Sequence, residues 1–548
     1  MGQNVKYSLF SATTLILFFI LAEGVSRFLF IHPGTCDFIE RRIIEQGLTP
    51  QKSGNEFRIF LCGESTMQGD ALYPKSTIEK WILIYLKDVL RKDVVKRVKI
   101  YNLARLGSNS RFITRSFLAT LPYKPDLVVF YTAHNDFVQL DNRHSGFDPQ
   151  PLAFGDKGFS KELIRRVIKQ SAFLSEITRC YIRLKIERHK REDRDKKDDL
   201  PEIETIDKHY DARYDAINRE SYKFKTILSN WVTNINTVIH AAQKRQVPLI
   251  FLSGVANYKE YPPNESVHQA GLDRETLSQW AAYHARADRR MADGNFKKAL
   301  GLYQKALRLD PEYALTYYRL GQCYENLSQF KKANDYYQAA NDKDRVPLRA
   351  PSEVNQFYKS LDEEKLSGVT VIRSQELFEK SLPHGIVDGR LLLDTMHPSI
   401  EGQALIALEI VKSIYDHEWL APKELWAWHD LGPTQDYEKH LGLDEDFEFS
   451  VYLKKAIFVG RFYDKAIEYS KKALQIKPDS IEAKRQLAWT YWRKGDRDEA
   501  IRLYEEIYEQ SPITCIEIMR KNPEISGKMF LARRRLGRRL IPQITRPL

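Results

Sequence analysis

The stretch FRIFLCGEST, residues 57–66, contains the features that decide the fold. Its first six residues are mostly apolar, aromatic or β-branched, and turn-forming residues bound the run on both sides, as expected of a buried strand. Ser65 follows this strand directly, at the end where open parallel sheets build their sites. A serine in this position is also a common helix N-cap, so a structural role and a chemical role both remain open.

Four further runs have the same character and are separated by helix-like sequence. They cover Val98–Leu103, Asp126–Tyr131, Val247–Leu252 and Val369–Ile372. Strands that alternate with helices predict an open α/β domain with a parallel sheet.

Two of the intervals between the predicted strands are long. The first, 154–245, contains helical sequence and a mixed-charge run at 189–199, which is typical of a solvated helix or linker.

The second long interval contains an internal repeat that returns near the C-terminus. Ala299 and Ala333 lie 34 positions apart, and so do Ala466 and Ala500. This period is the tetratricopeptide length. The resemblance covers about 281–344 and 447–512, with Ala488 standing where glycine is usual. It implies α-helical hairpins that bind a protein partner. Each block has about two repeats, fewer than independent stability requires, so each should pack against the α/β domain or the other block.

Polar residues follow three of the predicted strands and recur in a late loop. Besides Ser65, they lie in the segments NLARLGSN (102–109), AHND (133–136), which contains Asn135, and DTMHPS (394–399), which contains Asp394 and His397. The carboxyl ends of parallel strands share one edge of a sheet, so these groups should lie close together. A serine hydroxyl needs an imidazole to take its proton, and a carboxylate orients that imidazole and stabilises its charged form.

This ordered set resembles the SGNH, or GDSL-like, hydrolase family over about 57–417. The resemblance implies a flavodoxin-like three-layer domain in which Ser65 is the nucleophile and Asp394 and His397 are the acid and base. It also implies an oxyanion hole formed by Ser65, Gly107 and Asn135. Two positions depart from the family pattern: Glu64 stands where aspartate is usual, and Ala133 where glycine is usual. The Ala133 change leaves open a weakly active or degenerate enzyme.

Several other residues are candidates for substrate contact or for structure near this edge. They are His134, Asp136 and His384, together with Tyr258, Tyr261 and His268 in the segment after the fourth strand. The histidines lack the HxxH or HExxH spacing of metal ligands, so we expect neither a metal nor another cofactor.

Residues 7–22 form an uncharged, largely apolar run, and apolar residues resume at Val25 and 28–31. This pattern predicts a signal-anchor helix and an extracytoplasmic chain. The resumed run favours an uncleaved anchor, whereas the small residues around Glu23 also fit signal cleavage and a secreted product.

The net charge of the chain is +12 over 548 residues, and its basic residues alternate with acidic ones along the sequence. This distribution argues against nucleic-acid binding.

The predicted organisation has six parts. They are an anchor (1–33), a hydrolase-like domain in two parts (54–273 and 351–420), an inserted repeat block (274–350), a C-terminal repeat block (445–515) and a basic tail (516–548). Two functions fit. One is an anchored serine esterase or O-acyl transfer enzyme acting on an acyl ester, with a carbohydrate or cell-envelope glycan as the expected substrate class. The other is a non-catalytic assembly factor with a degenerate hydrolase-like core.

Overall fold

The computed structural model describes residues 45–138, 216–428, 431–432, 437–438, 441–460 and 462–521, together with residues 39, 42 and 43. The elements discussed below belong to one compact unit formed by residues 50–139 and 207–548. The predicted anchor (1–33), the mixed-charge run (189–199) and most of the basic tail lie outside the described residues. Within the described part of the chain, no helix is long and apolar enough to cross a membrane.

The predicted parallel sheet is confirmed. Its strands are β1 (Phe57–Gly63), β2 (Val98–Asn102), β3 (Leu127–Tyr131), β4 (Leu249–Leu252) and β5 (Val369–Ile372). They lie in the order β2-β1-β3-β4-β5, and every neighbouring pair is parallel. This is the order of flavodoxin-like doubly wound sheets. It places β1 between β2 and β3, so the loop with Ser65 lies between the loops that follow those two strands.

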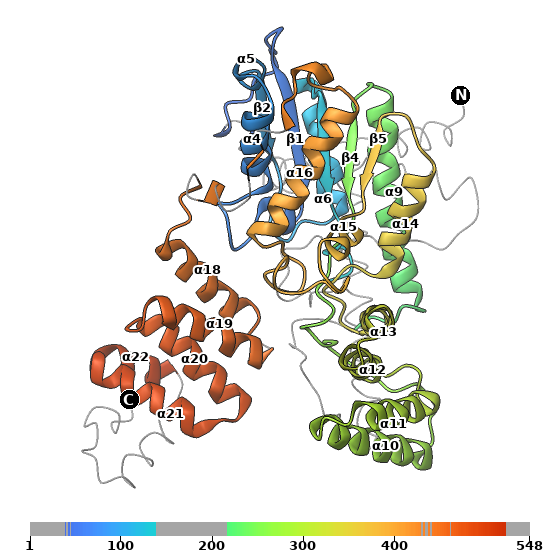
Figure 1. Cartoon of the computed structure of the whole chain (residues 1–548), viewed down its shortest axis with the longest axis vertical. Helices are drawn as coiled ribbons and strands as arrows, with labels where there is room; N and C mark the ends of the chain where they lie inside the picture. The colour runs from blue at the N-terminus through green and yellow to red at the C-terminus, as the bar shows by residue number, and fades with distance from the viewer. Residues whose placement is uncertain are drawn as a thin grey trace, which may run out of the picture. The chain divides into compact units, whose positions relative to one another are not determined.

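Helices cover both faces of the sheet (Figure 1). On one face, α4 (Ile78–Val89) and α16 (Ile400–Asp416) form a core with inward residues of β1, β3 and β4. On the other face lie α6 (Ser110–Thr120), α9 (Tyr222–Gln243) and α14 (Ser352–Glu363). There Phe130 of β3 packs against Phe117 of α6 and Phe251 of β4, at ring-centroid distances of 5.4 and 5.2 Å. Alternate residues of each strand thus face two separate apolar layers.

Shorter elements connect these layers. They are α3 (Ser65–Gln68), α5 (Lys92–Val95), η1 (Leu121–Tyr123), α15 (Ser374–Lys380) and η3 (Lys423–Leu425).

The two repeat blocks are helical hairpins, as the 34-residue period predicts. The inserted block contains α10 (Arg274–Ala292), α11 (Phe296–Leu309), α12 (Ala314–Asn326) and α13 (Phe330–Lys343). The C-terminal block contains α18 (Glu445–Phe458), α19 (Tyr463–Ile476), α20 (Ile481–Lys494), α21 (Arg497–Gln510) and α22 (Pro512–Lys521). Gly321 shows why small residues recur: a Cβ there would lie 2.6 Å from the Tyr337 ring. The glycine therefore lets α12 and α13 approach closely.

Each block packs against the α/β domain, as expected of blocks too short to be stable alone. In the inserted block, the Tyr318 hydroxyl donates a hydrogen bond to the Lys259 carbonyl at 2.6 Å. In the C-terminal block, Lys465 forms an ion pair with Glu260 at 3.1 Å. Lys259 and Glu260 both belong to the segment after β4, so this segment contacts both blocks.

Candidate active site

Ser65 lies at the carboxyl end of β1 and is the first residue of α3. Glu64 occupies the N-cap position of that helix, so the Ser65 hydroxyl is not used as the cap. Gly63, the last residue of β1, is closely packed: a Cβ there would lie 2.8 Å from the Tyr131 carbonyl oxygen of β3 and even closer to Met67. Only glycine fits at this position. Ser65 itself is 5% exposed.

A continuous chain of hydrogen bonds joins Ser65 to Asp394. The Ser65 hydroxyl lies 2.8 Å from His397 Nε2, and His397 Nδ1 lies 2.8 Å from Asp394 Oδ2. Asp394 Oδ1 also accepts from the backbone N–H groups of Met396 and His397, at 2.9 Å each. These bonds fix the carboxylate, which in turn orients the imidazole with Nε2 toward the serine. The structure thus brings together the three residues predicted as nucleophile, base and acid.

The electrostatics of this pair favour an ionised Asp394 and a basic His397. Burial alone would raise the pKa of Asp394, but the His397 charge and the hydrogen bonds from His397 and Met396 lower it to about 2. Burial acts to lower the pKa of His397, but the charge and hydrogen bond of Asp394 outweigh it, and Asp70 and Glu64 add to the same effect. The pKa of His397 is therefore raised above its ordinary value.

Three loops are tied together around Ser65. The Asn135 side-chain amide donates to the Ser108 carbonyl at 2.9 Å, which joins the loop after β3 to the loop after β2. The Ser108 hydroxyl donates to the Gly63 carbonyl at 3.1 Å, which joins the loop after β2 to the residue before Glu64. Gly107 has a φ of +70°, a conformation that favours glycine, and open space surrounds the position of its missing Cβ. The predicted oxyanion residues therefore lie on loops fixed beside the serine.

The buried Glu64 side chain binds the loop after β3 through both of its carboxyl oxygens. Its Oε1 accepts from the Thr132 hydroxyl and from the N–H groups of Ala133 and His134, and its Oε2 accepts from the N–H groups of His134 and Asn135, all within 2.9–3.2 Å. Burial and the charge of Asp136 raise the pKa of Glu64 to about 8, against the opposing effect of these hydrogen bonds. The Glu64 side chain thus holds the segment that carries Asn135.

Replacement of Glu64 by glutamine should loosen this loop. One oxygen becomes an NH2 group and then faces backbone N–H donors, which leaves buried donors unpaired. We expect a loss of about 1–3 kcal/mol in the free energy of unfolding, measured by urea denaturation above pH 8, where Glu64 is ionised, and slower reaction at Ser65. Glu64→Asp keeps both acceptors on a shorter side chain and should lose less. Unchanged unfolding of Glu64→Gln would show that the loop does not depend on the carboxylate.

The other candidates near this edge have structural partners. His134 is fully buried and accepts from the Ala350 N–H at Nδ1, and burial, with the His397 charge, lowers its pKa to about 3. Asp136 accepts from both the N–H and the hydroxyl of Ser110, at the start of α6. His384 stacks on Phe330 of the inserted block, at a centroid distance of 3.9 Å.

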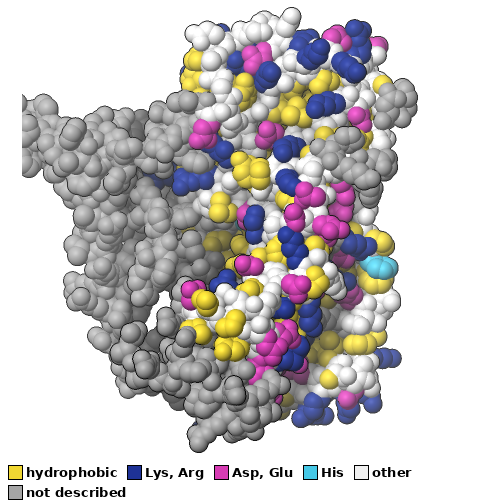
Figure 2. All heavy atoms as spheres, turned by 90° about the vertical axis from the view of Figure 1, so that its left-hand side faces the viewer, with side chains coloured by type: hydrophobic (Ala, Val, Ile, Leu, Met, Phe, Trp, Pro, Cys, Tyr) yellow, Lys and Arg dark blue, Asp and Glu magenta, His cyan; other side chains and the backbone are white. Residues whose placement is uncertain are grey.

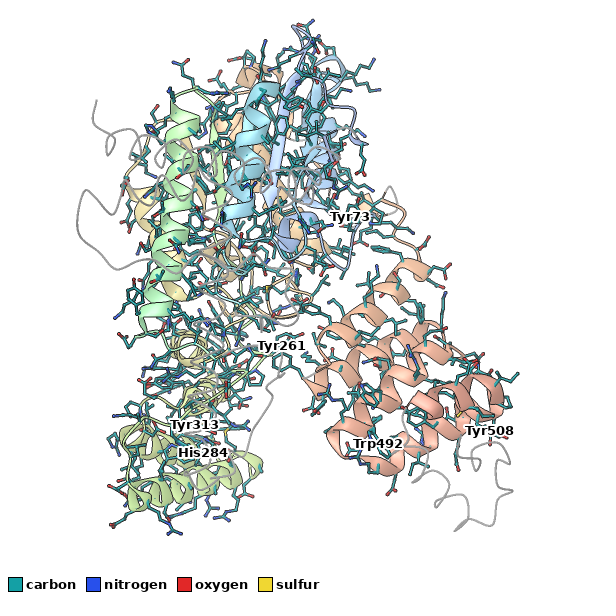
Figure 3. The ribbon with its side chains drawn as sticks, turned by 180° about the vertical axis from the view of Figure 1, so that it is seen from behind. Tyr73, Tyr261, His284, Tyr313, Trp492 and Tyr508 are labelled. Carbon is teal, nitrogen blue, oxygen red and sulfur yellow. The ribbon has the colours of Figure 1, made fainter. Side chains whose placement is uncertain are left out.

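The three candidates after β4 also have partners within packed segments. The Tyr258 ring lies under the buried Arg349 guanidinium, and Tyr261 lies 3.3 Å from Tyr469 of α19, hydroxyl to hydroxyl. Figure 3 shows Tyr261 facing the C-terminal helices. His268 contacts Asp310 at 2.5 Å and stacks on Tyr313. The interpretation as a packed connecting segment therefore accounts for all three.

Several residues that lie close to Ser65, Asp394 and His397 were not predicted from the sequence. Asp70 Oδ2 lies 3.9 Å from His397 Nε2, and Phe458 of α18 packs edge-on against the His397 ring at 5.5 Å. Lys455 reaches the carbonyl of Leu393, which precedes Asp394. One signal was available for the lysine: it continues the spacing of Phe447 and Val451 along α18, so it falls on that helix's apolar face.

Within the described residues, no group of three or more His, Cys, Asp or Glu side chains has the arrangement of a metal site. Figure 2 shows Lys and Arg side chains interspersed with Asp and Glu side chains over one face of the molecule.

Comparisons with solved structures return two kinds of protein. A GDSL-like lipase from Bacteroides thetaiotaomicron is 10% identical, covers 69% of this chain and 98% of its own, and has a TM-score of 0.28. A protein described as a putative acylhydrolase from Bacteroides fragilis is 10% identical, with coverages of 69% and 96% and a TM-score of 0.29. A TPR protein from Thermus thermophilus is 16% identical, with coverages of 46% and 96% and a TM-score of 0.14.

Comparisons by sequence identify the repeats. No curated protein matches this chain. The family model described as TPR repeat matches residues 287–328, and the model described as tetratricopeptide repeat matches residues 463–512. These matches fall within the two blocks in which the 34-residue period was found. The chain therefore carries tetratricopeptide repeats in both its inserted and its C-terminal helical blocks.

Proposed function

We propose that this protein is an SGNH-type serine ester hydrolase or O-acyl transfer enzyme that works through an acyl-Ser65 intermediate. The observation that carries the proposal is the continuous hydrogen-bond chain from the Ser65 hydroxyl through His397 to Asp394. Hydrogen-bonded serine, histidine and aspartate are the parts that nucleophilic acyl transfer requires. Their position at the carboxyl edge of a parallel sheet is where open α/β folds bind ligands.

The first half of the reaction forms the acyl-enzyme. Ser65 Oγ attacks the ester carbonyl carbon while His397 Nε2 takes the hydroxyl proton, and Asp394 stabilises the resulting imidazolium. The tetrahedral oxyanion would be held by the N–H groups of Ser65 and Gly107 and by the Asn135 amide. That amide has two N–H donors, of which one is bonded to the Ser108 carbonyl. The intermediate then breaks its bond to the alcohol oxygen, which leaves with the proton from His397.

The second half uses the same residues in reverse. An incoming hydroxyl group gives its proton to His397 and attacks the acyl carbon, and Ser65 leaves with the proton returned from the imidazole. Water as the incoming group gives hydrolysis and a free acid. A sugar hydroxyl gives a new ester and therefore acyl transfer.

The position of Asp70 supports the proposal that the leaving group of the ester is a polyhydroxylated alcohol. Its carboxylate is 3.9 Å from His397 Nε2, the atom that protonates the departing oxygen, and the side chain is partly exposed. A carboxylate at this place accepts hydrogen bonds from hydroxyl groups next to the scissile ester. We therefore propose an O-acylated carbohydrate, such as a cell-envelope glycan, as the substrate class.

The Asp70→Asn change should slow the hydrolysis of sugar esters much more than the hydrolysis of simple esters. We expect kcat/KM for an O-acetylated oligosaccharide to fall by about 10–100-fold, because the charged acceptor is replaced by a neutral amide and one accepting oxygen becomes a donor. Hydrolysis of p-nitrophenyl acetate, whose leaving group has no neighbouring hydroxyl, should fall much less. Steady-state kinetics on both esters measures the wild-type to variant ratio of kcat/KM for each substrate. Equal losses on the two substrates would argue against a leaving-group contact.

We further propose an extracytoplasmic enzyme, either anchored through residues 1–33 or released by signal cleavage near Glu23. The tetratricopeptide repeats support binding of a protein partner.

Labelling of the full-length chain with a fluorophosphonate tests the catalytic proposal. Stoichiometric labelling, with the adduct on Ser65 by peptide mass spectrometry, is expected. Absence of both labelling and p-nitrophenyl acetate turnover would instead favour the non-catalytic assembly factor.

A further inference from the structure

The C-terminal repeat block makes direct contact with the loop that carries the acid and base. The ammonium of Lys455, from α18, donates to the carbonyl oxygen of Leu393 at 2.5 Å. The hydroxyl of Tyr469, from α19, donates to the same oxygen at 2.8 Å. Leu393 immediately precedes Asp394, so both donors act one residue away from the carboxylate that orients His397. We refer to Lys455 and Tyr469 as the Leu393 clamp.

The clamp is buried, which makes its hydrogen bonds costly to lose. Lys455 is 3% exposed, although lysine is rarely buried without a partner. Its ammonium lies 4.7 Å from the centre of the Tyr469 ring, so the two donors also contact each other. Burial lowers the pKa of Lys455 to about 7, and the charge of Asp394 opposes that shift. Lys455 thus interacts electrostatically with Asp394, in addition to its hydrogen bond to the carbonyl of Leu393.

Two further contacts connect α18 to the two sides of the triad. At the end of α18, the Phe458 ring packs edge-on against the His397 ring. Near its start, Phe447 and Val451 form an apolar cluster with Leu72, which follows the Ser65 helix, and Leu393 packs against this cluster. A single helix of the repeat block therefore touches the segment after the nucleophile, the base and the residue before the acid.

We propose that the C-terminal tetratricopeptide block is a structural part of the active site, in which Lys455 and Tyr469 are positioning residues for the Asp394–His397 loop. This inference rests on the proposed acyl transfer at Ser65. Its physical basis is that the loop's geometry depends on the Leu393 carbonyl, whose two clamp donors come from a different block of the chain. A base displaced by about 1 Å can slow a reaction about 100-fold.

The test uses the full-length chain with Lys455→Met, Tyr469→Phe and the double variant. Both changes keep the size of the side chain and remove the donor. Fluorophosphonate labelling gives two quantities: the rate constant per site and the final stoichiometry, which counts folded sites. We expect the double variant to keep the stoichiometry and to lose about 10–100-fold in rate constant. For p-nitrophenyl acetate, kcat should fall while KM stays near its wild-type value.

Matched controls lie on the same two helices. Lys454→Met removes an exposed lysine next to Lys455, and Tyr463→Phe removes a hydroxyl from α19 away from Leu393; both should react like the wild type. Clamp variants with wild-type rate constants would overturn the inference, and so would a fall in stoichiometry alone, since that indicates lost folding. A wild-type chain that takes no label overturns the proposed function and this inference with it. Labelled wild type with unaffected clamp variants overturns only the inference.

Discussion

Replacement of Ser65 by alanine is expected to lower kcat for ester hydrolysis by at least about 10⁴-fold and to abolish fluorophosphonate labelling. The proposed acyl-enzyme forms only on the Ser65 oxygen, and alanine leaves His397 with no hydroxyl to deprotonate. The residual rate would come from groups that bind the substrate and its oxyanion. Turnover of p-nitrophenyl acetate, followed at high enzyme concentration, measures the effect.

The fold should survive this change, which makes the result interpretable. The Ser65 hydroxyl is bonded to His397 rather than to the helix backbone, so its loss removes no N-cap. Ser108→Ala shows what the loss of a different buried hydroxyl does to ester turnover. The Ser108 hydroxyl donates to the Gly63 carbonyl and does not contact His397. Ester turnover that persists in Ser65→Ala would mean that another group attacks the ester.

Asp394→Asn is expected to lower kcat by about 10⁴-fold and to change the pH dependence of the remaining activity. Because this position accepts from the backbone N–H groups of Met396 and His397, an asparagine would keep its oxygen there and present its NH2 group to His397 Nδ1. It then neither stabilises the imidazolium nor selects the tautomer with a basic Nε2.

The direction of the pH effect follows from the raised pKa of His397. The base works only when neutral, so wild-type activity should fall as the pH drops through a midpoint above the ordinary histidine value of about 6.5. Removing the Asp394 charge leaves burial as the main influence on His397, and burial lowers its pKa. The acid limb of kcat/KM should therefore move to lower pH in Asp394→Asn. If the acid limb of kcat/KM stays at the same pH in Asp394→Asn, the group that titrates there is not His397.

The strands could be predicted because buried parallel strands leave contiguous apolar runs in the sequence. The errors lie at their ends. The fourth strand was predicted from Val247 but begins at Leu249. Pro248 has no N–H to donate, although its carbonyl still accepts from Val128 at 3.0 Å. The repeat hairpins were predictable for a different reason, since close helix packing requires small residues at a fixed period.

The grouping of Ser65, Asp394 and His397 was predictable from their order along the chain, because sheet topology brings strand ends together. The surroundings of the triad were not. Asp70 and Phe458 lie beside His397 at positions that no sequence motif indicates. Glu64 looked like a departure from a pattern, whereas its extra length lets it bind the loop that carries Asn135. The Leu393 clamp depends on how one block docks on another, which periodicity within the block does not encode.

The hydrogen bond between Ser65 and His397 spans 332 positions of the sequence, which has a consequence for the chain during synthesis. At typical elongation rates of 5–20 residues per second, His397 is synthesised roughly 17–66 s after Ser65. Lys455 and Tyr469 follow later still. Under the proposed mechanism, a growing chain therefore cannot react at Ser65 until most of its length has been made and folded.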